Sequence, residues 1–292
     1  MKFFSAKSFY RAPSDEKAPK EDGAFVNAQA GLFGVSDGVS AGYSPSNPPL
    51  IYPGGLTGGQ VATKEFCSAG MSVSAPVDVE EFALNANSRI RRAHNVQGKD
   101  PTRGQDVGGA SFAVCHFGPA KITFVIAGDC FALVKYNDSI SFLTGFDQAA
   151  FKEEQEANAT IAECFKQTEG DKGRAWDIYF PIFSARKIRC ANKNIGKGGY
   201  PLLNGDPALK ECWMVKKINC LSRPQFILLG SDGLLTSAAM NPARKEGTAL
   251  NVWSLYASGG LPTVLQWRDE TEDSLSHITG WPEASAVEIK LL

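Results

Sequence analysis

The chain has 292 residues, of which 43% are hydrophobic and 21% are charged, as is typical of a globular protein with a substantial core. Its formal net charge is −1 and it contains no long basic or acidic block, which argues against nucleic-acid binding. No apolar run is long enough to span a bilayer, and the N-terminus lacks the sustained apolar core of a signal peptide. We therefore expect a cytoplasmic protein that does not bind membranes.

The cysteines give further evidence on the cellular compartment. They number seven, are dispersed along the chain and form no Cys-x-x-Cys pair. Buried free thiols in a reducing cytoplasm are thus expected, rather than a disulfide framework or a zinc site.

The first organised part of the chain is a predicted β-hairpin. Two short apolar runs, Ala24–Val26 and Leu32–Val35, flank a stretch of small and polar residues, and the second strand ends at Asp37. A loop rich in Pro, Gly and Ser follows. Apolar periodicity then predicts an antiparallel pair of helices, one over Gln60–Met71 and one that starts near Asp78 as its N-cap.

The middle of the chain changes to β-structure. From Gly108 to Leu143, closely spaced apolar runs predict an antiparallel meander, and Ala149–Lys166 has a helical pattern. The basic, glycine-rich segment Asp171–Asn204 is predicted to be an irregular excursion over the surface, and long loops of this kind are often functional. The remaining predicted elements are the strands Cys212–Ile218 and Phe226–Leu229, the helices Leu250–Ala257 and Pro262–Thr271, and the strand Ala286–Leu292.

This order of elements decides the fold class. A hairpin, a helix pair, a meander and then mixed elements do not fit a parallel sheet built of βαβ units. They fit an α+β layered fold with antiparallel sheets. No segment has the composition of an interdomain linker, so residues 1–292 are expected to form a single domain.

Three aspartates share one sequence context. Asp37, Asp129 and Asp232 each follow an apolar strand-like run and lie next to a glycine, in LFGVSDG, FVIAGDC and ILLGSDG. Three such strand ends can converge on one site, where crowded carboxylates raise one another's pKa unless a cation binds them. Oxygen ligands suit Mg²⁺ or Mn²⁺ better than zinc. For each aspartate alone a plain Asp-Gly turn is the alternative, but the repeated context favours a metal site.

The same motifs resemble those of the metal-dependent serine/threonine protein phosphatases of type 2C. KEDG, LFGVSDGVSAG, GGASFAVCHF with ITFVIAGDC, and FILLGSDGLLT resemble four motifs of that family, in the family's order, from about Glu21 to the C-terminus. The resemblance implies a central antiparallel β-sandwich flanked by antiparallel helix pairs, a four-layer αββα arrangement. It also implies two or three divalent cations, Mg²⁺ or Mn²⁺, in a cleft at one end, with residues 171–204 as a flap-like excursion.

The resemblance further implies roles for individual residues. Asp37 would bridge two core cations and, with Asp232, would carry the catalysis, while Asp129 would join Asp232 in a third and weaker cation site. Glu21 would anchor waters of the second cation, and Asp22 matches the residue beside it. The full set of implied metal ligands is Glu21, Asp37, Gly38 through its carbonyl, Asp129, Asp232 and Glu283.

Several positions depart from the family pattern. Glu283, followed by Ala284, stands where the family has its last aspartate ligand; we expect it to bind metal with adjusted geometry, the alternative being a solvated turn residue. Lys17 occupies the position of the arginine that grips phosphate, and Arg11 could substitute for it. For both cations the alternative is an ordinary solvated side chain. Val39 replaces the histidine that some relatives use as an acid.

The resemblance implies hydrolysis of phosphoserine and phosphothreonine in proteins, by in-line attack of a water that bridges two cations. The partner would be a phosphoprotein substrate, the product of a partner kinase, and the enzyme would be a monomer. The alternative is a catalytically weakened pseudophosphatase that uses the fold as a regulatory or binding module. The residues at Lys17, Val39, Thr236 and Glu283 favour this alternative, and the three strand-end aspartates oppose it.

Overall fold

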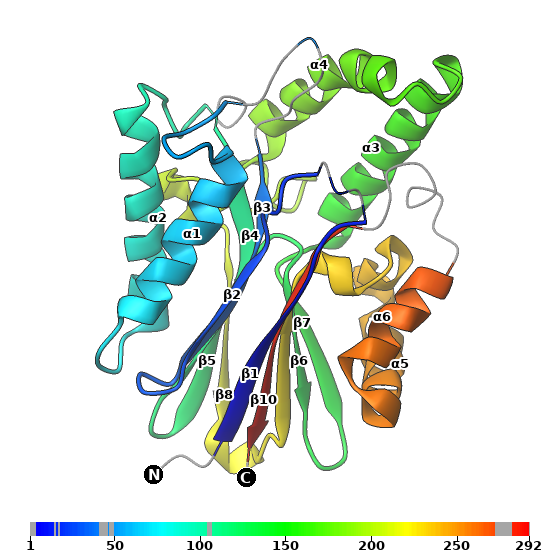
Figure 1. Ribbon diagram of the computed structural model, residues 1–292. Helices are drawn as coiled ribbons and strands as arrows, with labels where there is room; N and C mark the ends of the chain where they lie inside the picture. The colour runs from blue at the N-terminus through cyan, green and yellow to red at the C-terminus, as the bar shows by residue number, and fades with distance from the viewer. Residues whose placement is uncertain are drawn as a thin grey trace.

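Two five-stranded antiparallel sheets form the centre of the molecule in the computed structural model, which describes residues 4–14, 16, 18–40, 46, 50–103, 107–271 and 282–291 (Figure 1). The first sheet has the order β1-β10-β9-β6-β7, with bounds Phe4–Arg11, Ala284–Leu291, Phe226–Gly230, Phe131–Lys135 and Ile140–Thr144. The second has the order β2-β3-β4-β5-β8, with bounds Gly23–Asn27, Leu32–Val39, Gly109–Phe117, Lys121–Ala127 and Met214–Asn219.

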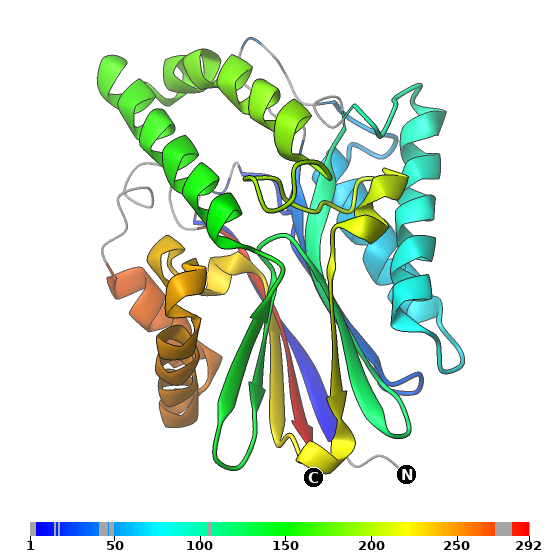
Figure 2. The same ribbon diagram turned by 180° about the vertical axis from the view of Figure 1, so that it is seen from behind.

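Helices cover both outer faces and one end of this sandwich (Figures 1 and 2). Helices α1 and α2 pack on the second sheet, α5 and α6 pack on the first, and the pair α3–α4 lies at the end opposite the chain termini. The α+β class and the four-layer arrangement are therefore confirmed. The helix bounds are Gly58–Ser72 for α1, Val79–Val96 for α2, Gln148–Gln167 for α3, Lys172–Cys190 for α4, Lys245–Gly259 for α5 and Leu261–Glu270 for α6.

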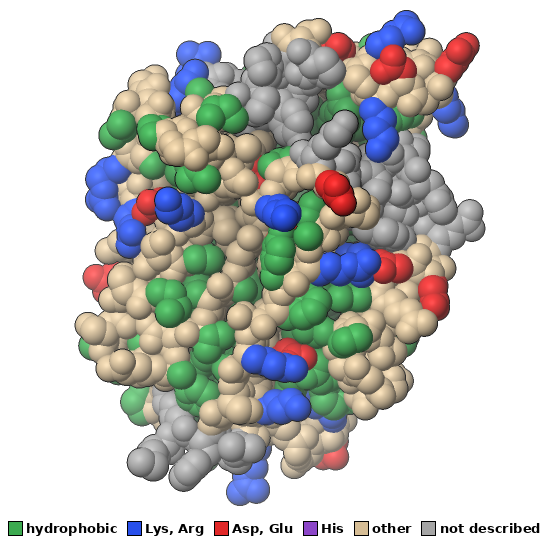
Figure 3. All heavy atoms as spheres, in the orientation of Figure 1, with side chains coloured by type: hydrophobic (Ala, Val, Ile, Leu, Met, Phe, Trp, Pro, Cys, Tyr) green, Lys and Arg blue, Asp and Glu red, His purple; other side chains and the backbone are tan. Residues whose placement is uncertain are grey.

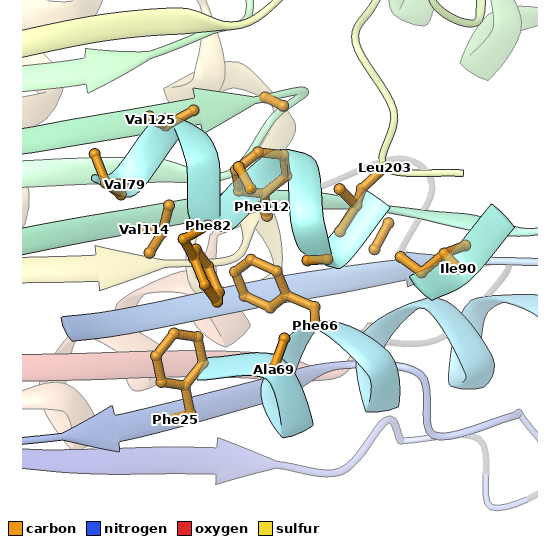
Figure 4. Packing of buried hydrophobic residues seen from close by; sticks show 14 of the residues in the cluster. Phe25, Phe66, Ala69, Val79, Phe82, Ile90, Phe112, Val114, Val125 and Leu203 are labelled. Atoms are coloured by element: carbon orange, nitrogen blue, oxygen red, sulfur yellow. The ribbon is translucent and has the colours of Figure 1, made fainter. Parts of the chain in front are cut away.

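The sheets are apolar on both faces because each face meets another layer. Successive side chains of a strand point to opposite faces, and in β4 the side chains of Ala113 and Cys115 enter the core between the sheets. Phe112 and Val114 point the other way and pack against the helix pair, where Phe66 of α1 contacts Phe112 (Figure 4). This explains why β4 is an almost continuous apolar run rather than an alternating one.

The predicted helix pair is confirmed, and its start sites follow from capping. The Thr57 hydroxyl accepts a hydrogen bond from the Gln60 backbone N–H, and the Gln60 side chain accepts one from Thr57 N–H, which is a capping box. The Asp78 carboxylate caps α2 by accepting from two backbone N–H groups of its first turn. Both interactions satisfy N–H groups that a helix end leaves without partners.

Two elements differ from the sequence prediction. Strand β1, Phe4–Arg11, is not predicted by the sequence because its side chains are only half-buried, yet it pairs along its whole length with β10. The segment 171–204 is not irregular throughout, because most of it is helix α4. Asp171 caps this helix, and an internal Pro181 disguises the helical pattern in the sequence.

The free-thiol prediction is confirmed: all seven cysteines are unpaired, four of them buried and three partly buried. None of the helices in the described residues combines the length and the hydropathy that a bilayer crossing requires. On the face seen in Figure 3, the Lys and Arg side chains of the described residues are interspersed with Asp and Glu rather than gathered in one patch.

Candidate active site

Four aspartates lie at the end of the sandwich that the α3–α4 pair faces (Figure 1). Asp37 is near the end of β3 and pairs with Ser111 of β4. Asp22 directly precedes β2, Asp129 follows β5, and Asp232 follows β9. Because these strands begin or end at the same edge, the fold brings together side chains that are far apart in the sequence and belong to both sheets.

The four carboxylates act on one another electrostatically. Burial raises the pKa of Asp37 well above its usual range, and the charges of Asp22, Asp232 and Asp129 raise it further. Burial, followed by the charge of Asp232, raises the pKa of Asp129 to about 6. Burial and the charge of Glu283 raise the pKa of Asp22. These mutual effects place the four aspartates in one cluster, which we call the aspartate cluster, and each member keeps partial exposure to solvent.

Two oxygens of the aspartate cluster lack partners. Oδ1 of Asp22 and Oδ1 of Asp129 are buried and accept no hydrogen bond from the residues that the structure describes. A buried acceptor without a donor is costly, and a hard divalent cation would satisfy both oxygens while it neutralises the repulsion. The donor set therefore fits Mg²⁺ or Mn²⁺.

The aspartate cluster is not a closed metal cage as it stands. Within the described part of the chain, no three Asp, Glu, His or Cys side chains already form a group that could hold a metal ion. The Asp232 carboxylate is instead close enough to Asp37 to raise the pKa of Asp37 further.

A serine links the two sheets at this edge. Ser231 Oγ donates to Asp22 Oδ2 at 2.7 Å and accepts from the Ser285 backbone N–H at 2.9 Å. Nearby, Gly38 has no room for a side chain, since a Cβ there would lie 2.6 Å from the Glu21 carbonyl oxygen. The close approach of two backbones explains the glycine, while the role of the Gly38 carbonyl as a ligand stays a prediction.

Glu21 is placed differently from Asp22. Its carboxylate accepts hydrogen bonds from the hydroxyls of Ser40 and Thr57 and lies against Gly59 at the start of α1. Burial raises its pKa, and the hydroxyl donors oppose that rise. The structure thus directs Glu21 toward the N-terminus of α1 rather than into the aspartate cluster, and it is Asp22 that joins the cluster.

Glu283 lies at the margin of the aspartate cluster, where its charge acts on Asp22. Both of its oxygens are already used: Oε1 accepts from the Glu21 backbone N–H at 2.5 Å, and Oε2 accepts from the Tyr10 hydroxyl at 2.9 Å. As a metal ligand it would have to give up at least one of these bonds. Its assignment as a ligand remains a prediction, and the observed contacts give it a role in joining β1, β10 and the segment before β2.

Known proteins match this chain in structure rather than in sequence. The sequence matches no protein-family model and no curated protein. The structure matches that of the phosphatase PstP in complex with two manganese ions, at 14% sequence identity and a TM-score of 0.53, over 99% of this chain and 98% of that chain. It matches the Mycobacterium tuberculosis serine/threonine phosphatase PstP/Ppp at 15% identity and a TM-score of 0.55, over 99% of this chain and 98% of that chain. It also matches the Staphylococcus aureus serine/threonine phosphatase Stp1 at 13% identity and a TM-score of 0.57, over 99% of this chain and 96% of that chain. This chain has the type 2C phosphatase fold.

Within the type 2C fold of this chain, one of the two cationic side chains expected to bind phosphate, that of Arg11, is engaged away from the aspartate cluster. The Arg11 guanidinium forms an ion pair with Asp269 of α6 at 2.7 Å. Asp269 also accepts from Arg268, which is fully buried and donates to the Gly233 carbonyl beside Asp232. Arg11 thus completes a network that supports the Asp232 turn, and Lys17 lies outside the described residues.

Two further residues near the site were not found from the sequence. Lys187 of α4 is buried and donates to the carbonyls of Ser40 and Val107, at 3.2 Å each, and Arg186 acts electrostatically on Asp129. Both belong to the segment that the sequence predicts to be irregular. The only available signal was the basic composition of that segment.

Proposed function

We propose that this chain is a Mn²⁺- or Mg²⁺-dependent phosphatase that hydrolyses phosphoserine and phosphothreonine in proteins. The observation that carries the proposal is the aspartate cluster, whose mutual repulsion and two unsatisfied buried oxygens fit divalent cations. The similarity in fold to phosphatases, one of them in complex with two manganese ions, supports it. We further propose a phosphoprotein as the partner and a monomeric enzyme in the cytoplasm.

Asp37, Asp129, Asp232 and Asp22 would hold the cations. Cations bound there would activate water and neutralise charge on the phosphoryl group. The protein would hold these carboxylates in place: Ser231 donates a hydrogen bond to one oxygen of Asp22, and the other oxygen has no hydrogen-bond donor among the described residues. The partial exposure of the aspartates gives a phosphate monoester access to them.

The second candidate is a pseudophosphatase that binds metal or partners without turnover. The observation that favours it is the engagement of Glu283 and Arg11, because both are tied to other protein groups rather than free for substrate or metal. The two candidates share the prediction of metal binding and differ in the prediction of hydrolysis.

The deciding experiment is a Mn²⁺ titration of the metal-free chain with p-nitrophenyl phosphate and with a phosphothreonine peptide. We expect hydrolysis that requires Mn²⁺ and falls by at least about 100-fold in Asp37→Asn and in Asp232→Asn, since each loses charge that holds the cations. Leu250→Ala, an exposed change on helix α5, serves as the control. Stabilisation by Mn²⁺ without hydrolysis of either substrate would establish the pseudophosphatase instead.

A further inference from the structure

Within the described residues, Arg186 on helix α4 is held by neither an ion pair nor a hydrogen bond. Its Nε is buried without an acceptor among them. A buried guanidinium nitrogen without an acceptor is costly. Its neighbour on the helix, Arg189, is exposed and paired with Glu153 at 2.6 Å. The contrast shows that acidic partners are present along this helix pair and that Arg186 is not placed to use one.

Arg186 is held close to the aspartate cluster by its surroundings. Its guanidinium lies over the ring of Tyr200, 5.7 Å from the ring centre. The next residue of that segment, Pro201, is against the turn before Asp129, where its carbonyl oxygen would lie 3.3 Å from a Cβ placed on Gly128. The guanidinium and the Asp129 carboxylate are close enough to affect each other electrostatically, although they form no ion pair.

The backbone that carries Arg186 is anchored on the site. Lys187 donates to the carbonyl of Ser40, which follows β3, and to that of Val107, just before β4. The segment after α4 pairs with β4, because Ala110 and Leu203 exchange two backbone hydrogen bonds. Figure 2 shows the C-terminal end of α4 descending toward the strand ends. The arginine is therefore presented by a fixed element rather than by a free loop.

We propose that Arg186 binds the phosphoryl group of the substrate and supplies the arginine fork that the N-terminal segment does not. An arginine presents a planar fork that matches phosphate oxygens, and the Nε without an acceptor is one of its donors. Arg11, the N-terminal arginine considered for this role, is engaged by Asp269. The inference rests on the proposed function, because the aspartate cluster attracts a phosphate only when cations neutralise it.

The test measures binding of inorganic phosphate to the Mn²⁺-loaded chain by calorimetry, so that it does not depend on turnover. Arg186→Ala should weaken phosphate binding by about 10- to 100-fold, the usual effect of losing hydrogen bonds to a charged group. Arg186→Lys should recover part of the loss, because lysine keeps the charge without the fork. Arg189→Ala, on the same helix, is the matched control and should bind phosphate as the unchanged chain does.

Mn²⁺ binding to each variant is measured in the same way and should be unchanged, since Arg186 is not a ligand. If Arg186→Ala binds Mn²⁺ normally and binds phosphate as tightly as the unchanged chain, the assignment of Arg186 is overturned while the proposed function stands. An equal loss of phosphate affinity in Arg189→Ala would also overturn it, because any positive charge on helix α4 would then have the same effect. If the unchanged chain binds Mn²⁺ and phosphate but hydrolyses nothing, the proposed function fails and a weakened phosphate affinity in Arg186→Ala still supports the binding role.

Discussion

The charge on Asp129 should destabilise the metal-free protein, and its removal should stabilise it. The pKa of Asp129 is raised from 3.8 to about 6, and a difference of about two pKa units corresponds to about 3 kcal/mol at neutral pH. Asp129→Asn keeps the shape of the side chain and keeps an oxygen for Ser111, which lowers the pKa of Asp129. The value of about 6 already includes the attraction to Arg186. Because the new amide N–H₂ group also has to find an acceptor, we expect a gain of about 1 to 3 kcal/mol in the free energy of unfolding at pH 7.5.

The sign of the pH dependence follows from the direction of the shift. A carboxyl whose pKa is raised by folding favours the folded state fully below the unfolded pKa of 3.8, and this contribution is lost as the pH rises through about 6. The advantage of Asp129→Asn over the unchanged chain should therefore be roughly halved at pH 5 and should disappear below about pH 4. Urea unfolding in the presence of a chelator, followed by tryptophan fluorescence, measures both values.

Addition of Mn²⁺ should reverse the order of stability, because only the unchanged chain keeps the full set of charged ligands. If Asp129→Asn is no more stable than the unchanged chain at pH 7.5 without metal, the crowding of charge inferred from the structure is refuted. An equal gain at pH 4 and pH 7.5 would also refute it, since the effect would then come from packing.

Other changes test other parts of the site. Glu283→Gln should cost about 1 to 2 kcal/mol of stability, because one of the two donors that now bind the carboxylate would face an amide N–H₂ group. If Glu283 is also a metal ligand, this variant needs more Mn²⁺ for half-maximal activity, and an unchanged titration would remove it from the ligand set. Lys187→Met should destabilise the chain by about 1 to 3 kcal/mol in thermal or urea unfolding, since two buried carbonyls lose their donor; unaltered stability would show that water replaces the ammonium group. Asp22→Asn should weaken Mn²⁺ binding measured by calorimetry, and Glu21→Gln should affect it less, because only Asp22 lies in the aspartate cluster.

The aspartate cluster was largely predictable from the sequence because its signal is local. Each of Asp37, Asp129 and Asp232 ends an apolar strand beside a glycine, and strand ends of an antiparallel sandwich meet at a common edge. The choice between Glu21 and Asp22 was not predictable in this way. Adjacent residues in extended chain point in opposite directions, and the partners that draw Glu21 away, Ser40 and Thr57, come from later parts of the chain.

The arginine side chains near the site were harder to predict, because their partners depend on a strand and a helix that the sequence pattern does not reveal. Arg11 ends strand β1, whose half-exposed pattern gave no strand signal, and the register with β10 places it beside Asp269. Arg186 is on α4, where an internal proline and few apolar positions concealed the helix. The prediction of the α+β class was correct although strand β1 and helix α4 were not predicted, because it depends on the order of the other elements and on their apolar runs.

The aspartate cluster draws its members from both halves of the sandwich, and this has a consequence for the lifetime of the protein in a cell. Asp22, Asp37 and Asp129 are attached to strands of one sheet and Asp232 to a strand of the other. A cation shared among them would act as a clasp between the two sheets, and at a concentration 100 times its dissociation constant would add about 2.7 kcal/mol to stability. When manganese or magnesium runs short, we expect the chain to open more often at this edge and to become a better substrate for proteases, so that the amount of protein would follow the supply of metal.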